Sequence, residues 1–317
     1  MRSPGTALLA SALLAASCST REPIAQAPPD AAPAASIAPS ASAPPIASAS
    51  ASSAPAIAPE AIEGMALVPA GPFIMGADTI GEMDERPAHE VTLPAFYLDL
   101  TEVTNEAYAR CVDAGACAPH DPKNAEANHF GSDTRFRAPR QPISSIPWDA
   151  ARAYCAWKGK RLPTEAEWEK AARGTDGRRY PWGNDEPTRE HAMFATGVTA
   201  EVGAHPKGDG PYGHHDMAGN VWEWIEDIYD PVAYTRPGAP RGVVGTCEEV
   251  MASLDDLRAH HKQGFTGSNP IPTECEHVLR GGAFNYPAAG LRSSNRVHHP
   301  ARYHLVMSGM RCARDAR

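Results

Sequence analysis

Ten residues near the middle of the chain, Lys160-Arg-Leu-Pro-Thr-Glu-Ala-Glu-Trp-Glu169, predict a helix that anchors the fold. Thr164 and Glu167 have the spacing of a capping box, in which each side chain bonds the backbone N–H group of the other residue. Gly174 follows at the distance expected for the end of this helix. The stretch therefore indicates a short, well-defined helix that begins directly after a loop.

A second helix is expected immediately before this stretch. Trp148 and Cys155 fall on one helical face, and Gly159 marks the C-terminal end. We expect the two helices to hold Trp157 and Trp168 against a sheet. We therefore expect a structural role for both tryptophans.

The N-terminal part of the domain has the pattern of strands followed by a helix. Two apolar runs within residues 65–76 are broken by proline and glycine, which predicts a hairpin. Alternating apolar residues over 89–99 predict a strand. Thr104 is the expected N-cap of a helix that ends near Gly115.

Residues 1–18 have the composition of a bacterial secretory signal. An apolar run follows Arg2, and Leu14-Ala-Ala-Ser-Cys18 is similar to a lipobox. We therefore expect an exported protein that is lipid-anchored through Cys18 at the bacterial cell envelope. The alternative is an ordinary small-residue cleavage site with an incidental cysteine.

Residues 19–61 are almost entirely Ala, Pro and Ser, which predicts a disordered tether that buries too little apolar surface to fold. Residues 62–317 are long enough for one domain with a sizeable core. The net charge is -9, and no Lys/Arg cluster has the character of a nucleic-acid footprint. We therefore do not expect a nucleic acid as the partner.

Six cysteines follow Cys18, and an even number in an exported protein predicts disulfides. Cys111 and Cys117 flank a short glycine-containing loop, which favours a local bond. None of the six has the CxxC spacing of a zinc site.

Six motifs of this domain occur in a fixed order along the chain, and together they resemble the formylglycine-generating enzyme (sulfatase-modifying factor) family. The resemblance covers nearly all of residues 65–314. The motifs are Glu102-Val-Thr-Asn105, Lys160 to Glu169, Tyr180-Pro-Trp-Gly183, Gly219-Asn-Val-Trp-Glu-Trp224, Arg280-Gly-Gly282 and Met310-Arg-Cys312.

The resemblance implies an α+β fold, namely the family's variant of the C-type-lectin fold, which is loop-rich with small antiparallel sheets and flanking helices. It also implies a long-range disulfide between Cys155 and Cys312. Cys247 and Cys275 then remain to pair with each other.

The family has a calcium site in the motif that begins at Asp216. The matching donors are Asp216, the carbonyl groups of Gly219 and Val221, and Glu223. Hard oxygen ligands of this kind suit Ca²⁺. The alternative is that Asn220 and Glu223 only hold the turn through bonds to the backbone.

Active members of the family follow the Arg-Gly-Gly run with two cysteines that bind copper as thiolates. Tyr286 and Leu291 stand at those two places here. Neither a phenol nor an alkyl group replaces a soft thiolate on Cu(I), so copper is not expected. Arg280, Asn295 and Arg296 remain as residues of a candidate peptide-binding cleft. The alternative for Arg280, together with Gly282, is that they shape the turn beneath that cleft.

Three pairs of adjacent histidines, at 214–215, 260–261 and 298–299, suggest iron as a minor hypothesis. A related branch makes sulfoxides with non-haem iron, but its histidine ligands come largely from an additional helical domain that this sequence lacks. Adjacent side chains also diverge on most backbones, so these pairs fit solvated surface residues better.

Two functions remain open at this stage. The first is a calcium-stabilised binding module for an exported protein, peptide or glycan at the cell envelope. The alternative is a formylglycine-generating oxidase that converts a substrate cysteine to formylglycine. Whether the chain is an enzyme stays undecided from the sequence.

Overall fold

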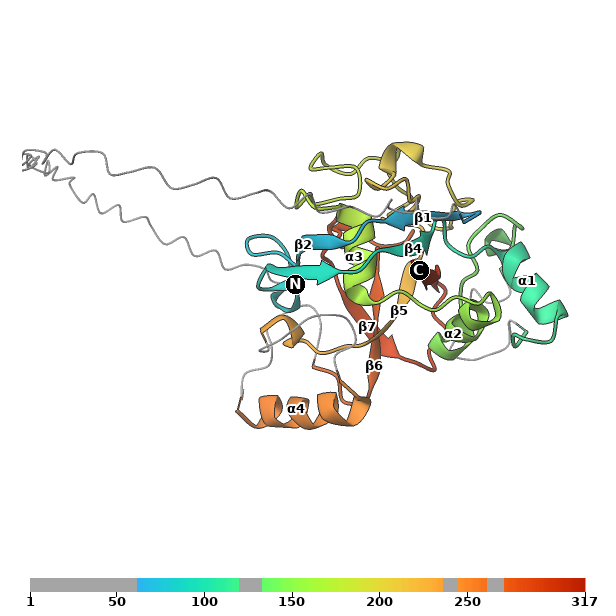
Figure 1. Ribbon diagram of the computed structural model, residues 1–317. Coiled ribbons are helices and arrows are strands. Elements are labelled where there is room, and N and C mark those ends of the chain that lie inside the picture. The colour runs from blue at the N-terminus through green and yellow to red at the C-terminus, as the bar shows by residue number, and fades with distance from the viewer. Residues whose placement is uncertain (1–61, 120–132, 236–244, 261–270, 317) are drawn as a thin grey trace, which may run out of the picture. The chain divides into compact units, whose positions relative to one another are not determined.

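The computed structural model describes residues 62–119, 133–235, 245–260 and 271–316. The expected signal segment with Cys18, the expected tether and His261 lie outside these residues. Figure 1 shows short strands with helices packed around them, joined by long irregular segments. Of the helices in the described part, none is long and apolar enough to span a membrane.

The strands form three separate sheets. The first joins β1 (Met65–Val68), β4 (Phe96–Asp99) and β9 (Ala313–Asp315) in the order β1-β4-β9. The second pairs β2 (Gly71–Met75) with β3 (His89–Leu93). The third has the order β7-β6-β5-β8 and consists of β5 (Trp222–Ile228), β6 (Glu276–Arg280), β7 (Val297–Pro300) and β8 (Ser308–Gly309). All pairs are antiparallel except β5 with β8.

Two of the expected strand features are wrong. Residues 65–76 do not form a hairpin, because β1 pairs with β4 while β2 pairs with β3. The single strand expected over 89–99 is interrupted at Pro94, which has no N–H group for a continuous ladder. Each half of each predicted element therefore joins a different sheet.

The predicted helices are confirmed. They are α1 (Asn105–Asp113), α2 (Trp148–Trp157) and α3 (Glu165–Arg173). Thr104 caps α1 by accepting a bond from the N–H group of Ala107, and the Thr164–Glu167 capping box is present on α3. Trp168 is fully buried, but Trp157 is 38% exposed, so only one tryptophan packs as expected.

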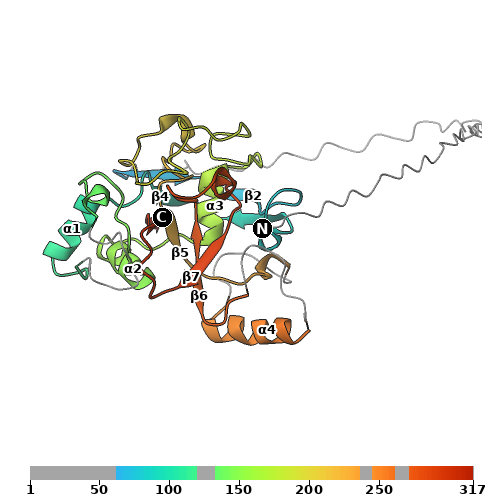
Figure 2. The same ribbon diagram turned by 180° about the vertical axis from the view of Figure 1, so that it is seen from behind.

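Two apolar clusters include residues of the third sheet, from its strands β5 and β6. Ala166, Trp168 and Ala171 of α3 pack against residues of β2, β3 and β4. Residues of α1 and α2 pack against Trp222 and Trp224 of β5. Figure 2 shows α3 at the centre of the fold and α1 and α2 together at its flank.

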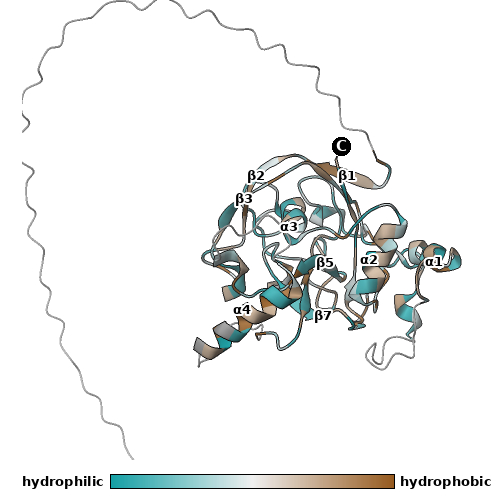
Figure 3. Cartoon of the chain, turned by 60° about the horizontal axis from the view of Figure 1, so that its bottom comes forward, coloured by the Kyte–Doolittle hydropathy of each residue, from teal (hydrophilic) through white to brown (hydrophobic). Residues whose placement is uncertain are grey.

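Three disulfides join the described cysteines: Cys111–Cys117, Cys155–Cys312 and Cys247–Cys275. These are the three expected pairs. Cys247 begins the remaining helix, α4 (Cys247–His260), which carries hydrophilic and hydrophobic residues along its length (Figure 3). Five short 3₁₀ segments complete the described elements: η1 (Met83–Glu85), η3 (Thr134–Phe136), η4 (Pro206–Gly208), η5 (Ala233–Thr235) and η6 (Ala288–Leu291).

Candidate functional site

The loop after β6 carries Tyr286 and Leu291, the residues at the expected copper positions. Gly281 and Gly282 both have positive φ values, 101° and 82°. A Cβ atom on Gly282 would lie 2.8 Å from the carbonyl oxygen of Gly290. Glycine is therefore required for the chain to fold back closely on itself here.

The side chains at the two expected copper positions lie in apolar and aromatic contacts. Leu291 is fully buried in a cluster with Tyr180, Ala192 and Ala218. The ring of Tyr286 meets Trp222 edge-on, with ring centroids 5.2 Å apart. Both side chains thus contribute to packing.

The disulfide bonds of the cysteines also argue against a copper site. Each of the six cysteines among the described residues is bonded to another. Cu(I) prefers thiolate ligands, and a cysteine in a disulfide cannot supply one. Within the described part, the residues present do not fit the family's copper centre.

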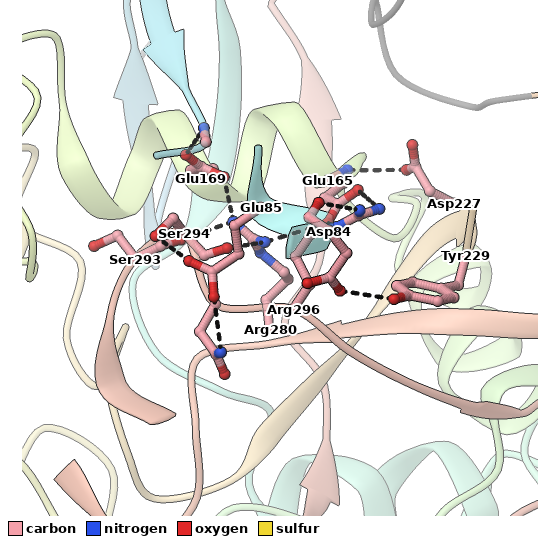
Figure 4. Close-up of polar contacts among 12 residues, drawn as sticks. Asp84, Glu85, Glu165, Glu169, Asp227, Tyr229, Arg280, Ser293, Ser294 and Arg296 are labelled. Atoms are coloured by element: carbon pink, nitrogen blue, oxygen red, sulfur yellow. Dashed lines mark hydrogen bonds and ion pairs between the residues drawn. The ribbon is translucent and has the colours of Figure 1, made fainter. Parts of the chain in front are cut away.

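Arg280 and Arg296, expected in a cleft, are instead fully buried in a polar network that joins β6, α3 and η1 (Figure 4). Arg280 bonds Glu165, Glu169 and the carbonyl oxygens of Ser293 and Ser294. We call this group the arginine network. Its members are Asp84, Glu85, Glu165, Glu169, Arg173, Asp227, Arg280, Arg292, Ser294, Asn295 and Arg296.

Other members of the arginine network are just as tightly held. Arg296 bonds both carboxylate oxygens of Glu165, at 2.6 and 3.0 Å. Asn295 is 8% exposed and donates to Glu85 at 3.2 Å. The expected cleft of Arg280, Asn295 and Arg296 is therefore corrected, because these side chains contact buried glutamates and not a surface.

Burial and charge set opposing pKa shifts within this network. Burial acts to raise the pKa of Glu85, but its bonds with Arg292, the Glu82 backbone and Ser294 together lower it below its usual value. Asp227 accepts a bond from the backbone N–H of Glu165 at 2.9 Å. Burial, together with the charge of Glu165, raises the pKa of Asp227 to about 7.

A second buried ionic group surrounds Arg311 and contains two of the expected calcium ligands. We call Glu102, Asp216, Glu223 and Arg311 the carboxylate cluster. Arg311 holds both oxygens of Glu223, at 2.7 and 2.8 Å, and the indole of Trp168 donates to Glu223 at 2.9 Å. Glu223 is therefore fully engaged by protein donors.

Asp216 and Glu102 are less well satisfied. Asp216 has a positive φ of 54° and accepts one bond from the N–H group of Gly203 at 2.5 Å. Glu102 is 1% exposed, and neither carboxylate oxygen has a hydrogen-bond partner among the described residues. Burial and the charge of Asp216 raise the pKa of Glu102 well above its usual value.

These contacts test the fit of calcium. In the described part of the chain, no group of three or more His, Cys, Asp or Glu side chains is placed to hold a metal ion. A calcium ion here needs main-chain oxygens, as the expected carbonyl groups of Gly219 and Val221 supply. The two unbonded oxygens of Glu102 are hard donors that sequence reasoning did not select, although Glu102 opens one of the motifs.

The side chain of Asn220 holds the turn by a hydrogen bond to the backbone, as the alternative to a calcium site expected. Its side-chain oxygen accepts from the backbone of Ala200 at 3.0 Å. A Cβ atom on Gly219 would lie 2.4 Å from the carbonyl oxygen of Met193. Glycine is therefore needed where the two loops meet.

The described histidines of these pairs differ in their surroundings. His298 bonds Glu276 at 2.6 Å and stacks on Tyr229. His215 bonds Asp209 at 2.7 Å. His214 is fully buried, and burial with the nearby charge of Arg311 lowers its pKa to about 3. The expectation that these histidines are solvated is wrong for His214 and His298.

The comparisons with known proteins agree with the motif order. Residues 51–316 match the family described as "Sulfatase-modifying factor enzyme 1-like domain". The chain belongs to this family. An inactive C-alpha-formylglycine-generating enzyme 2 of Bos taurus is 34% identical over 52% of the chain and 71% of its own length.

Other family relatives are longer proteins. A hercynine oxygenase of Mycolicibacterium smegmatis is 32% identical over 78% of the chain and 60% of its own length. A serine/threonine-protein kinase, pkn1 of Chlamydia pneumoniae, is 34% identical over 62% of the chain. The chain spans only 35% of that kinase's length.

Solved structures confirm the fold class. PvdO from Pseudomonas aeruginosa has a TM-score of 0.56 and 25% identity, covering 79% of this chain and 94% of that one. Treponema denticola variable protein 1 has a TM-score of 0.55 and 21% identity over the same shares. The fold is the expected loop-rich α+β variant of the C-type-lectin type.

Proposed function

We propose that this family member is a binding module for an exported protein, peptide or glycan, without the family's copper oxidase chemistry. One observation carries the proposal, namely the apolar packing of Leu291 and Tyr286 where the copper thiolates would lie. A relative whose name describes it as inactive is 34% identical to the chain, which supports the same reading.

The proposed location is the bacterial cell envelope, with a lipid on Cys18. Support comes from the composition of residues 1–18 and from the three disulfides, because disulfides persist in oxidising compartments. Expression of the full chain with Cys18→Ala should move the protein from the membrane fraction to the soluble exported fraction. Retention of that variant at the membrane contradicts lipid anchoring.

Calcium is proposed as a structural ion at the carboxylate cluster. Three carboxylates face one arginine there, so a divalent cation offsets the excess negative charge. Asp216, the carbonyl groups of Gly219 and Val221, and Glu102 would hold the ion. Glu223 would remain bonded to Arg311 and keep the cluster in place.

Calorimetric titration of the metal-free protein with Ca²⁺ tests this proposal. A stabilising ion raises the unfolding temperature, because it increases the free energy of unfolding by about 2.7 kcal/mol at a hundredfold excess over Kd. Asp216→Asn should weaken binding strongly. Asp185→Asn, at an exposed residue, serves as a control and should leave calcium affinity unchanged. Absence of heat and of any thermal shift removes calcium from the proposal.

The oxidase alternative is tested directly. The calcium-loaded protein is incubated with Cu(I), O₂ and a Cys-x-Pro-x-Arg peptide, and the peptide is weighed by mass spectrometry. A binding module leaves the peptide mass unchanged. Formation of formylglycine overturns the proposal, whatever the calcium result.

The double variant Tyr286→Cys/Leu291→Cys provides the matched control. It restores two thiols at the family's copper positions, so Cu(I) binding should appear in the variant and be absent from the wild type. Copper binding measured by absorbance of the thiolate complex distinguishes the two proteins. Equal copper binding shows that the native ligands lie elsewhere.

A further inference from the structure

A cavity of about 430 Å³ lies between α1 and the segment that runs from η3 to Ser145. Its lining shares no residue with the arginine network, with the carboxylate cluster or with the two expected copper positions. The lining residues that matter most are Tyr108, Ala109, Val112, Phe136, Ser144 and Ser145.

Hydrogen bonds hold the two walls of this cavity together. The side chain of Asn105, at the start of α1, donates to the carbonyl oxygens of Phe136 and Ala138 at 2.9 and 3.0 Å. The backbone N–H group of Glu106 donates to the carbonyl oxygen of Pro139 at 3.0 Å. The cavity is therefore formed before any ligand arrives, which lowers the entropy cost of binding.

The walls of the cavity are mostly apolar. Val112 comes from α1, and Phe136 and Ile143 of the facing segment are 4% and 5% exposed. Tyr108 adds an aromatic ring, because its hydroxyl group already donates to the carbonyl oxygen of Ala118 at 3.1 Å. A cavity of this volume, with apolar walls and a few polar groups, is the usual form of a ligand pocket.

The charged residues of the lining balance one another. Glu106 is paired with Arg110 at 2.8 Å. The other two charged residues of the lining, Asp113 and Arg137, have opposite signs. Burying a charged group costs free energy unless it finds a partner, so the cavity favours an uncharged ligand.

Two serine hydroxyl groups supply the polar part of the cavity. Ser144 and Ser145 are 6% and 3% exposed. Neither hydroxyl oxygen has a hydrogen-bond partner among the described residues, and neither is among the fully buried polar atoms that lack a partner. Both hydroxyl groups are therefore accessible. Because both residues line the cavity, a ligand inside it can reach them.

The backbone at Ser145 is held in an uncommon conformation. Its φ is 58°, a left-handed value that residues other than glycine seldom adopt. Its N–H group donates to the carbonyl oxygen of Leu305 at 3.1 Å, and its carbonyl oxygen lies 3.2 Å from Nδ1 of His304. Backbone conformations of this kind gather at ligand sites, where the surrounding contacts maintain them.

We propose that this cavity binds the side chain of a tyrosine in a peptide, with its ring against Val112 and Phe136 and its hydroxyl group bonded to the two serines. A phenol is uncharged and buries a large apolar ring. It also both donates and accepts a hydrogen bond, which suits two adjacent serine hydroxyl groups, whereas an indole only donates. The inference rests on the proposed binding function, which it narrows to one side chain and one surface.

Ligand-observed NMR titration of the full chain tests the proposal with N-acetyl-Ala-X-Ala-amide, in which X is Tyr, Phe or Ala. The tyrosine peptide should bind about threefold to tenfold more tightly than the phenylalanine peptide, because its hydroxyl group adds hydrogen bonds. The alanine peptide should bind more weakly than both. Equal affinities for the tyrosine and phenylalanine peptides, or no binding of any peptide, overturn the proposal.

Two further probes distinguish the classes of ligand. p-Cresol carries the same ring and hydroxyl group without a peptide, and N-acetylglucosamine represents a glycan. Both should bind more weakly than the tyrosine peptide, because p-cresol lacks the backbone contacts at the rim and a sugar ring meets apolar walls. Equal or tighter binding of p-cresol assigns the cavity to a free phenol instead, and equal or tighter binding of the sugar assigns it to a glycan.

The variant Ser144→Ala/Ser145→Ala tests the polar contact. It should weaken binding of the tyrosine peptide to the affinity of the phenylalanine peptide. Binding of the phenylalanine peptide should be unchanged, which also shows that the variant is folded. An equal loss for both peptides contradicts the contact with the serines.

A pair of alanine substitutions tests the surface. Ala109→Trp fills the cavity from an exposed position of α1 and should abolish binding of the tyrosine peptide. Ala153→Trp makes the same change at an exposed residue of α2 outside the lining and should bind like the wild type. Equal behaviour of the two variants contradicts the assigned surface.

Failure here is separable from failure of the proposed function. If the tyrosine peptide does not bind while the formylglycine assay stays negative, only the tyrosine site is lost. Formation of formylglycine removes the binding-module proposal itself.

Discussion

The arginine network and the carboxylate cluster are both buried, yet they differ in how their charges are met. Glu85, Glu165 and Glu169 each contact at least one arginine. In the cluster, Arg311 meets Glu223, while Glu102 has no hydrogen-bond partner among the described residues. In the first region these glutamates are paired with arginines of the protein, whereas the second region leaves one buried carboxyl group without a hydrogen bond among the described residues.

The two regions meet at one side chain. The indole of Trp168 donates to Glu223 of the cluster, and the guanidinium of Arg280 lies 5.5 Å from the centre of its ring. Trp168 is on α3, the helix that also supplies Glu165 and Glu169. Helix α3 thus contacts both buried ionic groups.

The largest expected effect is in the arginine network. Arg280→Ala leaves Glu165 and Glu169 buried without this partner, so the free energy of unfolding should fall by roughly 3–5 kcal/mol. Urea denaturation under non-reducing conditions measures it. Arg302→Ala, at an ion pair with side chains 56% and 43% exposed, is the matched control. It should cost under about 1 kcal/mol, and equal losses would show that burial does not decide the effect.

Asp227 gives the arginine network a pH dependence. Its pKa is raised from 3.8 to about 7, so its contribution to stability is fully present below about pH 4 and is lost as the pH rises to about 7. Asp227→Asn keeps an oxygen to accept the Glu165 backbone bond. The variant should match the wild type at pH 4 and exceed it above pH 7, by at most roughly 4 kcal/mol.

Thermal unfolding from pH 4 to pH 8 measures this difference. Asp185→Asn, at an exposed residue, is the control and should follow the wild type throughout. A gap between Asp227→Asn and the wild type that is constant with pH contradicts the assignment to titration of Asp227.

The sequence predicted the helices well because their signals are local. Thr164 with Glu167, and Thr104, are caps that act within a few residues, and both form. The hairpin over 65–76 failed because strand pairing is non-local. Nothing within that segment indicates that β1 pairs with residues some thirty positions later.

The candidate site shows the same difference between local and non-local sequence signals. The motif alone predicted that Tyr286 and Leu291 stand at the positions of the family's two thiols. The structure shows how these two side chains pack. The burial of Arg280 and Arg296 was not readable, because a charged residue normally predicts a surface. Their partners on α3 lie more than a hundred residues away along the chain.

The stability contribution of the carboxylate cluster should change with pH in the same direction as that of Asp227 in the arginine network. Because the folded-state pKa of Glu102 is raised, its contribution to stability declines as the pH rises above its usual range. At pH 8 without calcium, Glu102→Gln should therefore raise stability, by about 1–3 kcal/mol. With excess calcium the wild type should regain the advantage. Exposed Glu106→Gln is the control, and a calcium response that Glu102→Gln leaves intact excludes Glu102 as a ligand.

The smallest expected effects are at the caps of the helices beside the two regions. Thr164→Ala removes one half of a reciprocal capping box at the start of α3, and Thr104→Ala removes a single bond at the start of α1. Each should cost about 1 kcal/mol, because each variant removes one side-chain acceptor from a backbone N–H group, while the N–H group of residue 164 still donates to Glu167. Equilibrium denaturation of the two variants side by side measures the difference. A larger loss at Thr104 would mean that α1, and with it the neighbouring Glu102, contributes more to the fold than the capping geometry indicates.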